Sequence, residues 1–274
     1  MLFRSVPVSS DGCVGSSLDV VVGVRAIPTS VASGETICSG TSTNITITEQ
    51  TALAGTTYTW TVTNNVNVTG ASAGSGAVIS QLLTTTAAGG SVDYEITAHR
   101  NGCSQGVATT VTVIVNGTPD VAANPTSESI CDGDATSIAL STPNGVDMTT
   151  GGYTWTVLNV TNVTNHADQA APVAGPIAQT LDLVDPDLDG TVTYRIVPVS
   201  SDGCVGSSLD VVVGVRAIPT SVAAGETICS GESTNITITE QTALSGTTYT
   251  WTVTNNVNAG SRSEERRVGK ECRS

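Results

Sequence analysis

Polar and apolar residues alternate over short stretches of this chain, and no stretch shows a helical period. Thr43–Thr48 (TNITIT) alternates at a period of two, which is typical of a half-buried strand. Tyr58, Trp60 and Val62 should point to one face of a strand, with the intervening threonines facing water. Further strands are expected at Ala77–Leu83, Val92–Ala98 and Val107–Val115, and tight hairpin turns at Asn101–Cys103 and Asp202–Cys204. Six or seven short strands per roughly hundred residues predict a β-sandwich.

The same segment recurs along the chain. Gly34–Val62 (GETICSGTSTNITITEQTALAGTTYTWTV) returns almost unchanged at Gly225–Val253 and, in a weaker form, at Ser127–Val157. The longer segments Val6–Asn67 and Val197–Asn258 match at 59 of 62 positions. The recurrence of this segment predicts that the chain is a series of small modules, each of roughly 90–100 residues, instead of one large domain.

Proline-bearing junctions set the expected boundaries, because proline cannot donate to a strand ladder and stiffens a link. They lie at Val24–Pro28, Val115–Pro119 and Val215–Pro219. We therefore expect the end of one repeat, two complete repeats, the beginning of a fourth and a tail, at residues 1–26, 27–118, 119–217, 218–258 and 259–274. The two partial repeats should have exposed strand edges and little core.

The last thirteen residues, 262–274 (RSEERRVGKECRS), differ from the rest of the chain. They contain five of its ten basic residues and none of the strand pattern. The string resembles a translated sequencing-library adapter, which would make Cys272 foreign to the natural protein. A basic anchoring tail is the alternative interpretation.

Charge and hydropathy exclude several classes of protein. The net charge is −14 with only ten basic residues, so a nucleic-acid partner is not expected. No apolar run approaches the length of a membrane span, and the short run in residues 1–30 (DVVVGV) does not resemble an export signal. We expect a fragment whose signal and anchor lie outside the sequence, with no membrane insertion in this part.

The chain has seven cysteines, and six of them recur at regular positions. There is no C-x-x-C pair, and His99 and His166 are not arranged with cysteines at a metal-site spacing, so the cysteines fit disulfides better than a metal site. This favours an oxidising, extracellular compartment. The expected bonds join the two cysteines within each complete repeat, Cys38 with Cys103 and Cys131 with Cys204. Their loops of 65 and 73 residues would each contribute about 4 kcal/mol. Free buried thiols are the alternative.

The order of motifs supports a resemblance. I-C-x-G is followed by a T-I-T-like strand, TYTWTV, I-x-Q-x-L, V-x-Y-x-I, N/D-G-C and V-x-V-x-V, and the series recurs. This order resembles the PKD-like, immunoglobulin-like repeats of Bacteroidetes surface proteins, which often end in a gliding-motility-associated or type IX sorting domain. The resemblance covers all but Met1–Phe3 and the tail. It implies an extracellular stalk or adhesin-like role and no catalytic residue.

The chain departs from the related patterns in two ways. No sorting domain is present in the sequence, so the export route follows only from the resemblance. The Cys–Trp–Cys order is similar to that of antibody domains, but the first gap is longer. Tyr94 also precedes Cys103 by nine residues, whereas the tyrosine of a tyrosine corner precedes the cysteine by two.

Asp185, Asp187 and Asp189 form the D-x-D-x-D-G beginning of a calcium loop, where alternate carboxylates can converge on a cation. The twelfth position is Ile196 instead of glutamate, which excludes an EF-hand. The corresponding segment of the earlier repeat, Ala87–Ser91, has no acidic residue. A solvated surface turn is therefore the alternative to a calcium site, and no other cofactor is expected.

Candidate chemistry for an enzyme is absent from the sequence. His99 and His166 each occur in one repeat only, and no G-x-S-x-G motif precedes a helix. Sugar binding would need exposed rings, but eight of the nine aromatic residues occupy recurrent strand positions assigned to the core. They are Tyr58, Trp60, Tyr94, Tyr153, Trp155, Tyr194, Tyr249 and Trp251. The ninth is Phe3, near the beginning of the sequence.

These observations predict an all-β chain of tandem immunoglobulin-like (PKD-like) β-sandwich repeats. The expected function is that of a non-catalytic stalk, spacer or adhesin-like segment of a secreted or cell-surface protein. Its partner would be an extracellular protein or glycan. The alternative is a carbohydrate- or calcium-binding accessory module of a secreted protein.

Overall fold

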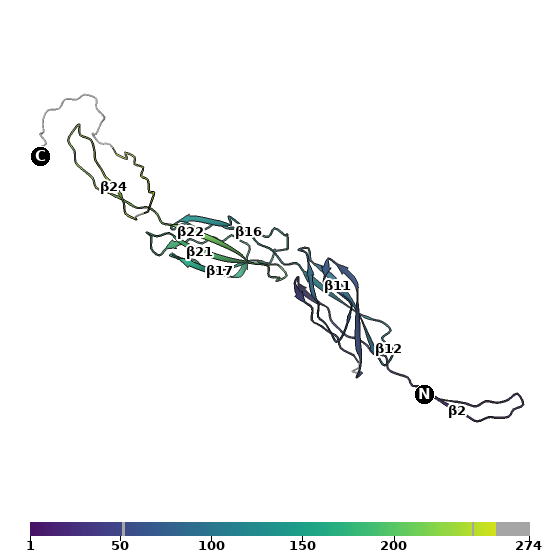
Figure 1. Cartoon of the computed structure of the whole chain (residues 1–274). Helices are drawn as coiled ribbons and strands as arrows, with labels where there is room; N and C mark the ends of the chain where they lie inside the picture. The colour runs from purple at the N-terminus through teal and green to yellow at the C-terminus, as the bar shows by residue number, and fades with distance from the viewer. Residues whose placement is uncertain (51–52, 243, 256–274) are drawn as a thin grey trace. The chain divides into compact units, whose positions relative to one another are not determined.

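The computed structural model describes residues 1–50, 53–242 and 244–255. The described residues form 24 strands joined by turns and contain no helix (Figure 1). No helix that could serve as a membrane span is therefore present among them. The predicted all-β class is confirmed. The tail expected at 259–274, including Cys272, lies outside the described residues.

The contacts divide the chain into two compact units. The first comprises Met1–Val121, Thr142–Gly152 and Pro198–Ser207, and the second comprises Ala122–Ser141, Tyr153–Val197 and Ser208–Ser274. Three segments that the repeat pattern assigns to residues 119–217 thus belong to the first unit. They are the junction 119–121, the loop Thr142–Gly152 and the hairpin segment Pro198–Ser207.

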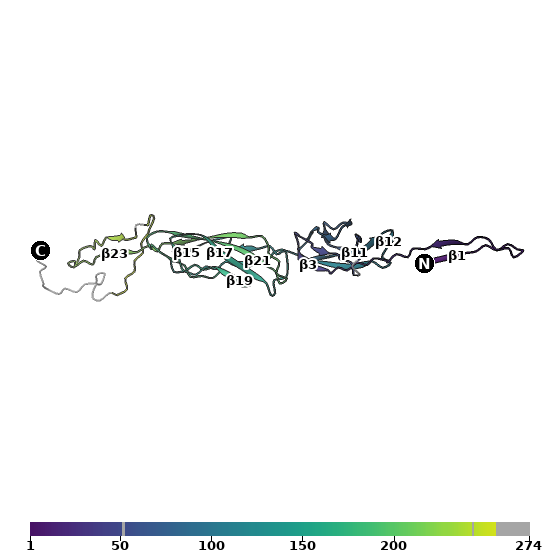
Figure 2. The same cartoon turned by 90° about the horizontal axis from the view of Figure 1, so that it is seen from below.

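The main sheet of the first unit has six strands. They are β3 (Glu35–Cys38), β6 (Thr57–Val66), β8 (Gly74–Ser75), β11 (Gly90–Arg100), β12 (Cys103–Ser104) and β13 (Thr109–Asn116). Their order is β3-β13-β11-β6-β8, with β12 also paired to β11. Figure 2 labels β3, β11 and β12 of this sheet. Every pair is antiparallel except β3 and β13, which run parallel. The alternation in the sequence did not predict this parallel pair.

Smaller sheets accompany the main sheet of the first unit. A three-stranded sheet joins β4 (Thr41–Ser42), β10 (Leu82–Thr85) and β7 (Val68–Thr69), and a two-stranded one joins β5 (Ile45–Thr46) and β9 (Val78–Ile79). One core unites side chains from the main sheet and the smaller sheets. It includes Ile45, Ile79, Leu83, Val92, Tyr94, Ile96, Val113 and Val115. The unit is therefore a β-sandwich.

The strand β6 shows why these residues form a sheet. Tyr58 and Trp60 are buried while the threonines between and beside them are exposed, as the alternation predicts. Threonine suits the exposed face because its branched side chain packs well on a pleated surface and its hydroxyl stays in water. Gly74 on β8 lies against Trp60, where a Cβ would come within 2.5 Å of the indole ring.

The second unit repeats the architecture. Its main sheet contains β15 (Ser127–Cys131), β17 (Gly152–Thr161), β19 (Gln169–Val173), β21 (Gly190–Val199) and β22 (Leu209–Arg216). The order is β15-β22-β21-β17-β19, and β15 again runs parallel to its neighbour. Two short ladders pair β14 (Ala122–Asn124) with β16 (Ala139–Ser141), and β18 (Val163–Thr164) with β20 (Asp182–Leu183). Tyr153, Trp155 and Tyr194 are buried in this unit.

The two partial repeats contain little structure. β1 (Leu2–Ser5) and β2 (Leu18–Val21) form an exposed two-stranded ribbon in the first unit. β23 (Ser221–Ala223) and β24 (Ile238–Glu240) form another two-stranded sheet in the second.

One prediction for the fourth repeat is wrong. Trp251, expected in the core, is 79 % exposed, and Tyr249 is only half-buried. The strands that cover Trp60 come from residues 74–100, and no counterparts of these strands lie among residues 218–255.

Candidate functional site

Cys38 lies at the end of the parallel strand β3. It is opposite Asn116, the last residue of β13, and the next residue, Ser39, donates its backbone N–H to the Asn116 carbonyl oxygen (2.8 Å). A glycine begins this approach, because a Cβ on Gly34 would lie 2.1 Å from the Thr112 carbonyl oxygen. The parallel pairing therefore fixes Cys38 at the end of the sheet where β13 finishes.

Cys204 lies in the hairpin turn that follows β21. The Ser200 N–H donates to the Cys204 carbonyl oxygen (2.9 Å), and the Cys204 N–H donates to the Ser200 hydroxyl oxygen (3.0 Å). Gly203 closes the turn with a φ of 80°, which favours glycine. Cys204 and Ser200 are both buried, with 0 % and 2 % of their surface exposed. The turn holds the thiol at a fixed place.

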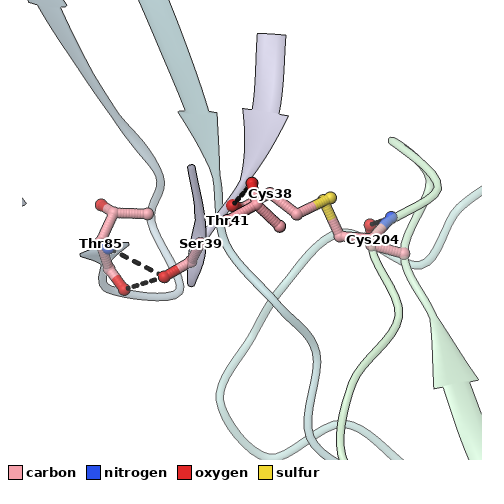
Figure 3. The surroundings of a disulfide bond; sticks show 6 residues. Cys38, Ser39, Thr41, Thr85 and Cys204 are labelled. Carbon is pink, nitrogen blue, oxygen red and sulfur yellow. Dashed lines mark hydrogen bonds between the residues drawn. A yellow bond between two sulfur atoms is a disulfide. The ribbon is translucent and has the colours of Figure 1, made fainter. Parts of the chain in front are cut away.

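A disulfide joins Cys38 to Cys204, with 5.6 Å between their Cα atoms (Figure 3). The Thr41 hydroxyl donates to the Cys38 carbonyl oxygen (2.7 Å). The Ser39 hydroxyl donates to the Thr85 carbonyl oxygen (3.1 Å) and accepts the Thr85 N–H (2.9 Å). These bonds, drawn in Figure 3, hold the Cys38 side of the bridge against β10. The bridge links residues 166 positions apart.

The surroundings of the hairpin in the first unit are closely packed. A Cβ on Gly206 would lie 1.8 Å from the carbonyl oxygen of Pro119, so only glycine fits beside this junction. The Asn144 N–H, from the loop 142–152, donates to the Asp120 carboxylate (3.0 Å). The junction, the loop and the hairpin therefore form one packed cluster, which explains why all three belong to the first unit.

The disulfide differs from the predicted pairing, and the sheet register gives the reason. Cys38 lies at the end of β13, whereas Cys103 pairs with Arg100 on the hairpin that precedes β13. The eight residues of β13 span about 26 Å, at roughly 3.3 Å per residue, whereas bonded cysteines have Cα atoms only about 4.4–6.8 Å apart. The predicted Cys38–Cys103 bond is therefore wrong.

The same register excludes a bond between Cys131 and Cys204. Cys131 lies opposite Arg216 at the end of β22, whereas Cys204 precedes the beginning of that strand. Cys131 is an exposed free thiol and Cys103 is a half-buried one. Cys13, on the exposed ribbon of the first unit, is free as well.

The structure does not bring the three aspartates of the calcium hypothesis together. Asp189 forms an ion pair with Arg216 (2.6 Å) and accepts the Ala217 N–H (3.0 Å). These two contacts, the backbone bond first, lower the pKa of Asp189 below its ordinary value. Asp185 instead accepts the N–H of Asp187 within a turn (3.1 Å). No metal-binding group of three or more histidine, cysteine or carboxylate side chains exists in the described part of the chain.

A glutamine that sequence reasoning left without a role organises the first core. Gln81, from the I-x-Q-x-L motif, accepts the Tyr94 hydroxyl (2.7 Å) and the Ser72 N–H (2.9 Å) through its side-chain oxygen. Its amide donates to the Ser72 carbonyl oxygen (2.7 Å), which also accepts the Trp60 indole N–H (3.2 Å). Burial raises the pKa of Tyr94 to about 12. The second unit repeats this network with Tyr194, Gln179, Ala167 and Trp155.

This network explains why the motif recurs. The polar atoms of the buried Tyr and Trp need partners. The glutamine side-chain oxygen accepts the Tyr hydroxyl, and the glutamine amide donates to the same backbone carbonyl oxygen that accepts the Trp N–H. The signal was visible in the sequence as Gln81 and Gln179 at equivalent places in two repeats. It marks a structural role, since both side chains point into the sandwich network and not to a ligand site.

The structure also locates the candidate residues for catalysis and for sugar binding. His99 contacts the hydroxyls of Thr59 and Ser104 (2.9 and 2.8 Å), and no carboxylate contact of this ring is found in the described residues. A cavity of about 440 Å³ in the second unit has no aromatic ring in its lining, which consists of Asp132, Pro186, Asp187, Ile218, Thr220, Gln241 and Thr242. The site that the geometry defines best is therefore the disulfide-bonded cluster.

A family model for the PKD-like domain matches residues 35–119, 128–219 and 226–266, well over half of the chain. The chain belongs to the PKD-like domain family. Domains of this kind are typically extracellular and non-catalytic. The three matches follow the recurrence of the I-C-x-G and TYTWTV motifs, so the tandem organisation expected from the sequence is confirmed.

Comparison with solved structures gives distant likenesses. The chain is 10 % identical to EC1-3 of Drosophila N-cadherin (70 % of this chain, 68 % of that one, TM-score 0.24). It is 14 % identical to the fibronectin(III)-like modules of Clostridium thermocellum CbhA (68 % and 94 %, TM-score 0.31). It is 13 % identical to an endo-fucoidan hydrolase of glycoside hydrolase family 107 (80 % and 34 %, TM-score 0.25). No function is inferred from these likenesses. No curated protein matches the chain in sequence.

Proposed function

We propose that this chain is a non-catalytic spacer segment of a large secreted or cell-surface bacterial protein. The observation that supports this role best is the Cys38–Cys204 disulfide, which connects the repeat at 27–118 with the repeat at 119–217. A structural disulfide requires an oxidising compartment, so the bond also supports an extracellular location. The motif order supports a source among the Bacteroidetes, with export by the type IX route.

The bond changes how the chain would carry a pulling force. Tension applied to the two ends reaches Cys38, crosses the disulfide and leaves from Cys204, so it bypasses the residues between them. These residues include every strand from β4 to β21. The strands β3 and β22 lie outside this loop and still carry the load. The bond limits how far the chain can extend under load, which suits a segment that holds another domain away from a surface.

Single-molecule stretching of the full chain, pulled from its ends, tests the proposal. The bypassed segment spans 166 residues, so breaking the bond should add about 580 Å of extended chain at roughly 3.5 Å per residue. We expect the oxidised chain to lack this extension and the Cys38→Ser chain to show it. Cys103→Ser is the matched control, because Cys103 lies inside the same loop but forms no disulfide. Equal extension of the oxidised and Cys38→Ser chains would contradict the mechanical role.

The second candidate is a binding module for glycan or calcium. Trp251 is the observation that bears on glycan binding. Its ring is 79 % exposed in the partial repeat 218–258, where the strands that pair with the Trp60 strand have no counterparts among the described residues. The full chain and its Trp251→Ala variant should be compared on a glycan array, and calcium titration should be followed by calorimetry at about millimolar concentration. Saturable glycan binding that the variant loses would favour this candidate over the spacer. A calcium heat that vanishes in Asp185→Asn would do the same.

A further inference from the structure

The disulfide follows a rule that the repeat pattern extends to other cysteines. Each complete repeat has a first cysteine, at the end of its parallel strand, and a second cysteine, in its later hairpin. The first cysteines are Cys38, Cys131 and Cys229, and the second cysteines are Cys13, Cys103 and Cys204. The observed bond joins the first cysteine of one repeat to the second cysteine of the next repeat.

Cys131 has the same structural setting as Cys38. Cys131 lies opposite Arg216 as Cys38 lies opposite Asn116, and both partners are the last residues of equivalent strands, β22 and β13. The residue after Cys131 donates its N–H to the Arg216 carbonyl oxygen (2.9 Å), as the residue after Cys38 does to Asn116 (2.8 Å). The Cys131 thiol is free and exposed.

The hairpin that presents a second cysteine forms without the bond. At Cys13, the Ser9 N–H donates to the Cys13 carbonyl oxygen (2.9 Å) and the Cys13 N–H donates to the Ser9 hydroxyl (3.1 Å). These distances match those of the Ser200–Cys204 turn (2.9 and 3.0 Å), although Cys13 is an exposed free thiol. The local sequence therefore shapes the hairpin before any partner arrives.

We propose that Cys131 and Cys103 are sites of the same inter-repeat disulfide as Cys38–Cys204. Cys131 takes the second cysteine of the repeat that follows its own, and Cys103 takes the first cysteine of the repeat that precedes its own. Consecutive bonds then overlap along an array, because Cys131 lies inside the loop that Cys38 and Cys204 close.

The bond forms by thiol–disulfide exchange with a small disulfide such as oxidised glutathione. One protein thiolate attacks that disulfide and releases a reduced thiol. The second protein thiolate then displaces the remaining half, so two protein thiols become one disulfide and the oxidant becomes two thiols.

The partner of Cys131 falls 65–73 residues after Cys229, which is beyond position 274 of this sequence.

An extended chain tests the rule directly. Residues 259–274 are replaced by a second copy of residues 68–118, which completes the fourth repeat and adds one cysteine equivalent to Cys103. After refolding in a glutathione buffer, non-reducing peptide mapping should show the added cysteine joined to Cys131, with Cys38–Cys204 retained. Cys131→Ser should leave the added cysteine as an alkylatable thiol, whereas the matched control Cys229→Ser should leave both bonds in place.

Two results with a folded extended chain would overturn the proposal. One is a bond between the added cysteine and Cys229, which would mean pairing within a repeat. The other is an added cysteine that remains a thiol in oxidising buffer.

The unextended chain gives a second test that needs no added repeat. In Cys38→Ser, the thiols of Cys131 and Cys204 are both available within one repeat. Mapping should find no Cys131–Cys204 bond under oxidising conditions, because the two lie at opposite ends of β22. Formation of that bond would overturn the rule, and loss of the Cys38–Cys204 peptide alone would support it.

Discussion

Two copies of one sequence occupy different environments in this protein. TYTWTV is the buried strand β6 at residues 57–62, yet the same letters at 248–253 form no strand. Trp60 is 6 % exposed, whereas its copy Trp251 is 79 % exposed. The sequence of a strand therefore determines which face can be buried, but burial itself requires the neighbouring strands β8 and β11.

Other identical residues also differ in burial between a partial repeat and a complete one. Val20 on the ribbon strand β2 is 46 % exposed, whereas its copy Val211 on β22 is fully buried. A Cβ on Gly34 would overlap the backbone of β13, while a Cβ on the copy Gly225 would meet nothing within 4 Å. Pairs of identical residues thus serve as internal controls, since a substitution changes the same side chain in two environments.

The largest difference is expected for Trp60→Ala against Trp251→Ala. Trp60 fills the core and donates its indole N–H to the Ser72 carbonyl oxygen, so its loss should cost the first sandwich about 3–5 kcal/mol. Trp251→Ala should change stability by less than about 0.5 kcal/mol, as exposed substitutions usually do. Urea unfolding of the full chain followed by circular dichroism measures both.

Equal losses of stability in the two tryptophan variants would contradict this comparison. It would mean that residues 248–253 acquire core packing in solution. A third variant, Trp155→Ala, should resemble Trp60→Ala, because Trp155 is buried and donates to the Ala167 carbonyl oxygen in the second unit.

The glycine pair should give the next largest difference. Gly34→Ala places a methyl group 2.1 Å from the Thr112 carbonyl oxygen, so β3 must shift away from β13, at a cost of about 2–3 kcal/mol. Gly225→Ala should be neutral, because the space around it is open. Hydrogen exchange at Ser39, whose N–H is bonded to Asn116, reports the shift of β3 directly. Unchanged protection of Ser39 in Gly34→Ala would show that the parallel pair tolerates the methyl group.

A smaller loss of stability is expected when the hydrogen-bond network of Gln81, Tyr94 and Ser72 is broken. Gln81→Leu removes the acceptor of the buried Tyr94 hydroxyl, which should cost about 1–2 kcal/mol, within the range for a buried group left unsatisfied. The exposed Gln50→Leu is the matched control and should be neutral. Because Gln81 and Tyr94 are bonded, the double variant Gln81→Leu/Tyr94→Phe should lose less than the sum of the two single variants. Simple additivity would mean that the bond contributes nothing.

Sequence alternation predicted the strands because it is a local property. It assigned Tyr58 and Trp60 to the buried face, while the Asn-Gly and Asp-Gly pairs placed the hairpin turns before Cys103 and Cys204. The parallel pairing of β3 with β13 was not predictable, since it joins segments about 78 residues apart through backbone atoms alone. The failure over Trp251 has a related cause: the pattern describes the strand but not whether its neighbours are present.

The candidate sites show the same limit. Regular cysteine spacing is compatible with bonds inside a repeat or between consecutive repeats, and only the register of Cys38 against Asn116 separates them. The D-x-D-x-D spacing suggested calcium, and Arg216, 27 residues further on, forms an ion pair with Asp189. In both motifs a partner distant in sequence determines what the local residues contact.

The smallest effect concerns pH and compares Tyr94 with Tyr249. Burial, with a smaller contribution from Glu35, raises the pKa of Tyr94 from 10.0 to about 12, so the folded chain favours the neutral phenol. Its contribution to stability is complete below pH 10, where the unfolded chain also keeps the proton. The contribution is lost as the pH rises from about 10 to about 12, because the unfolded chain ionises first. Tyr94→Phe should therefore lose less stability than the parent over this window, measured by urea unfolding at each pH.

Tyr249 is the matched comparison in the partial repeat. Burial and the charge of Glu240 also raise the pKa of this half-buried residue, but Tyr249 should ionise at lower pH than Tyr94 when phenolate absorbance is followed. Ionisation of Tyr94 near pH 10 in the folded chain would contradict the closed network around Gln81 and remove this distinction between complete and partial repeats.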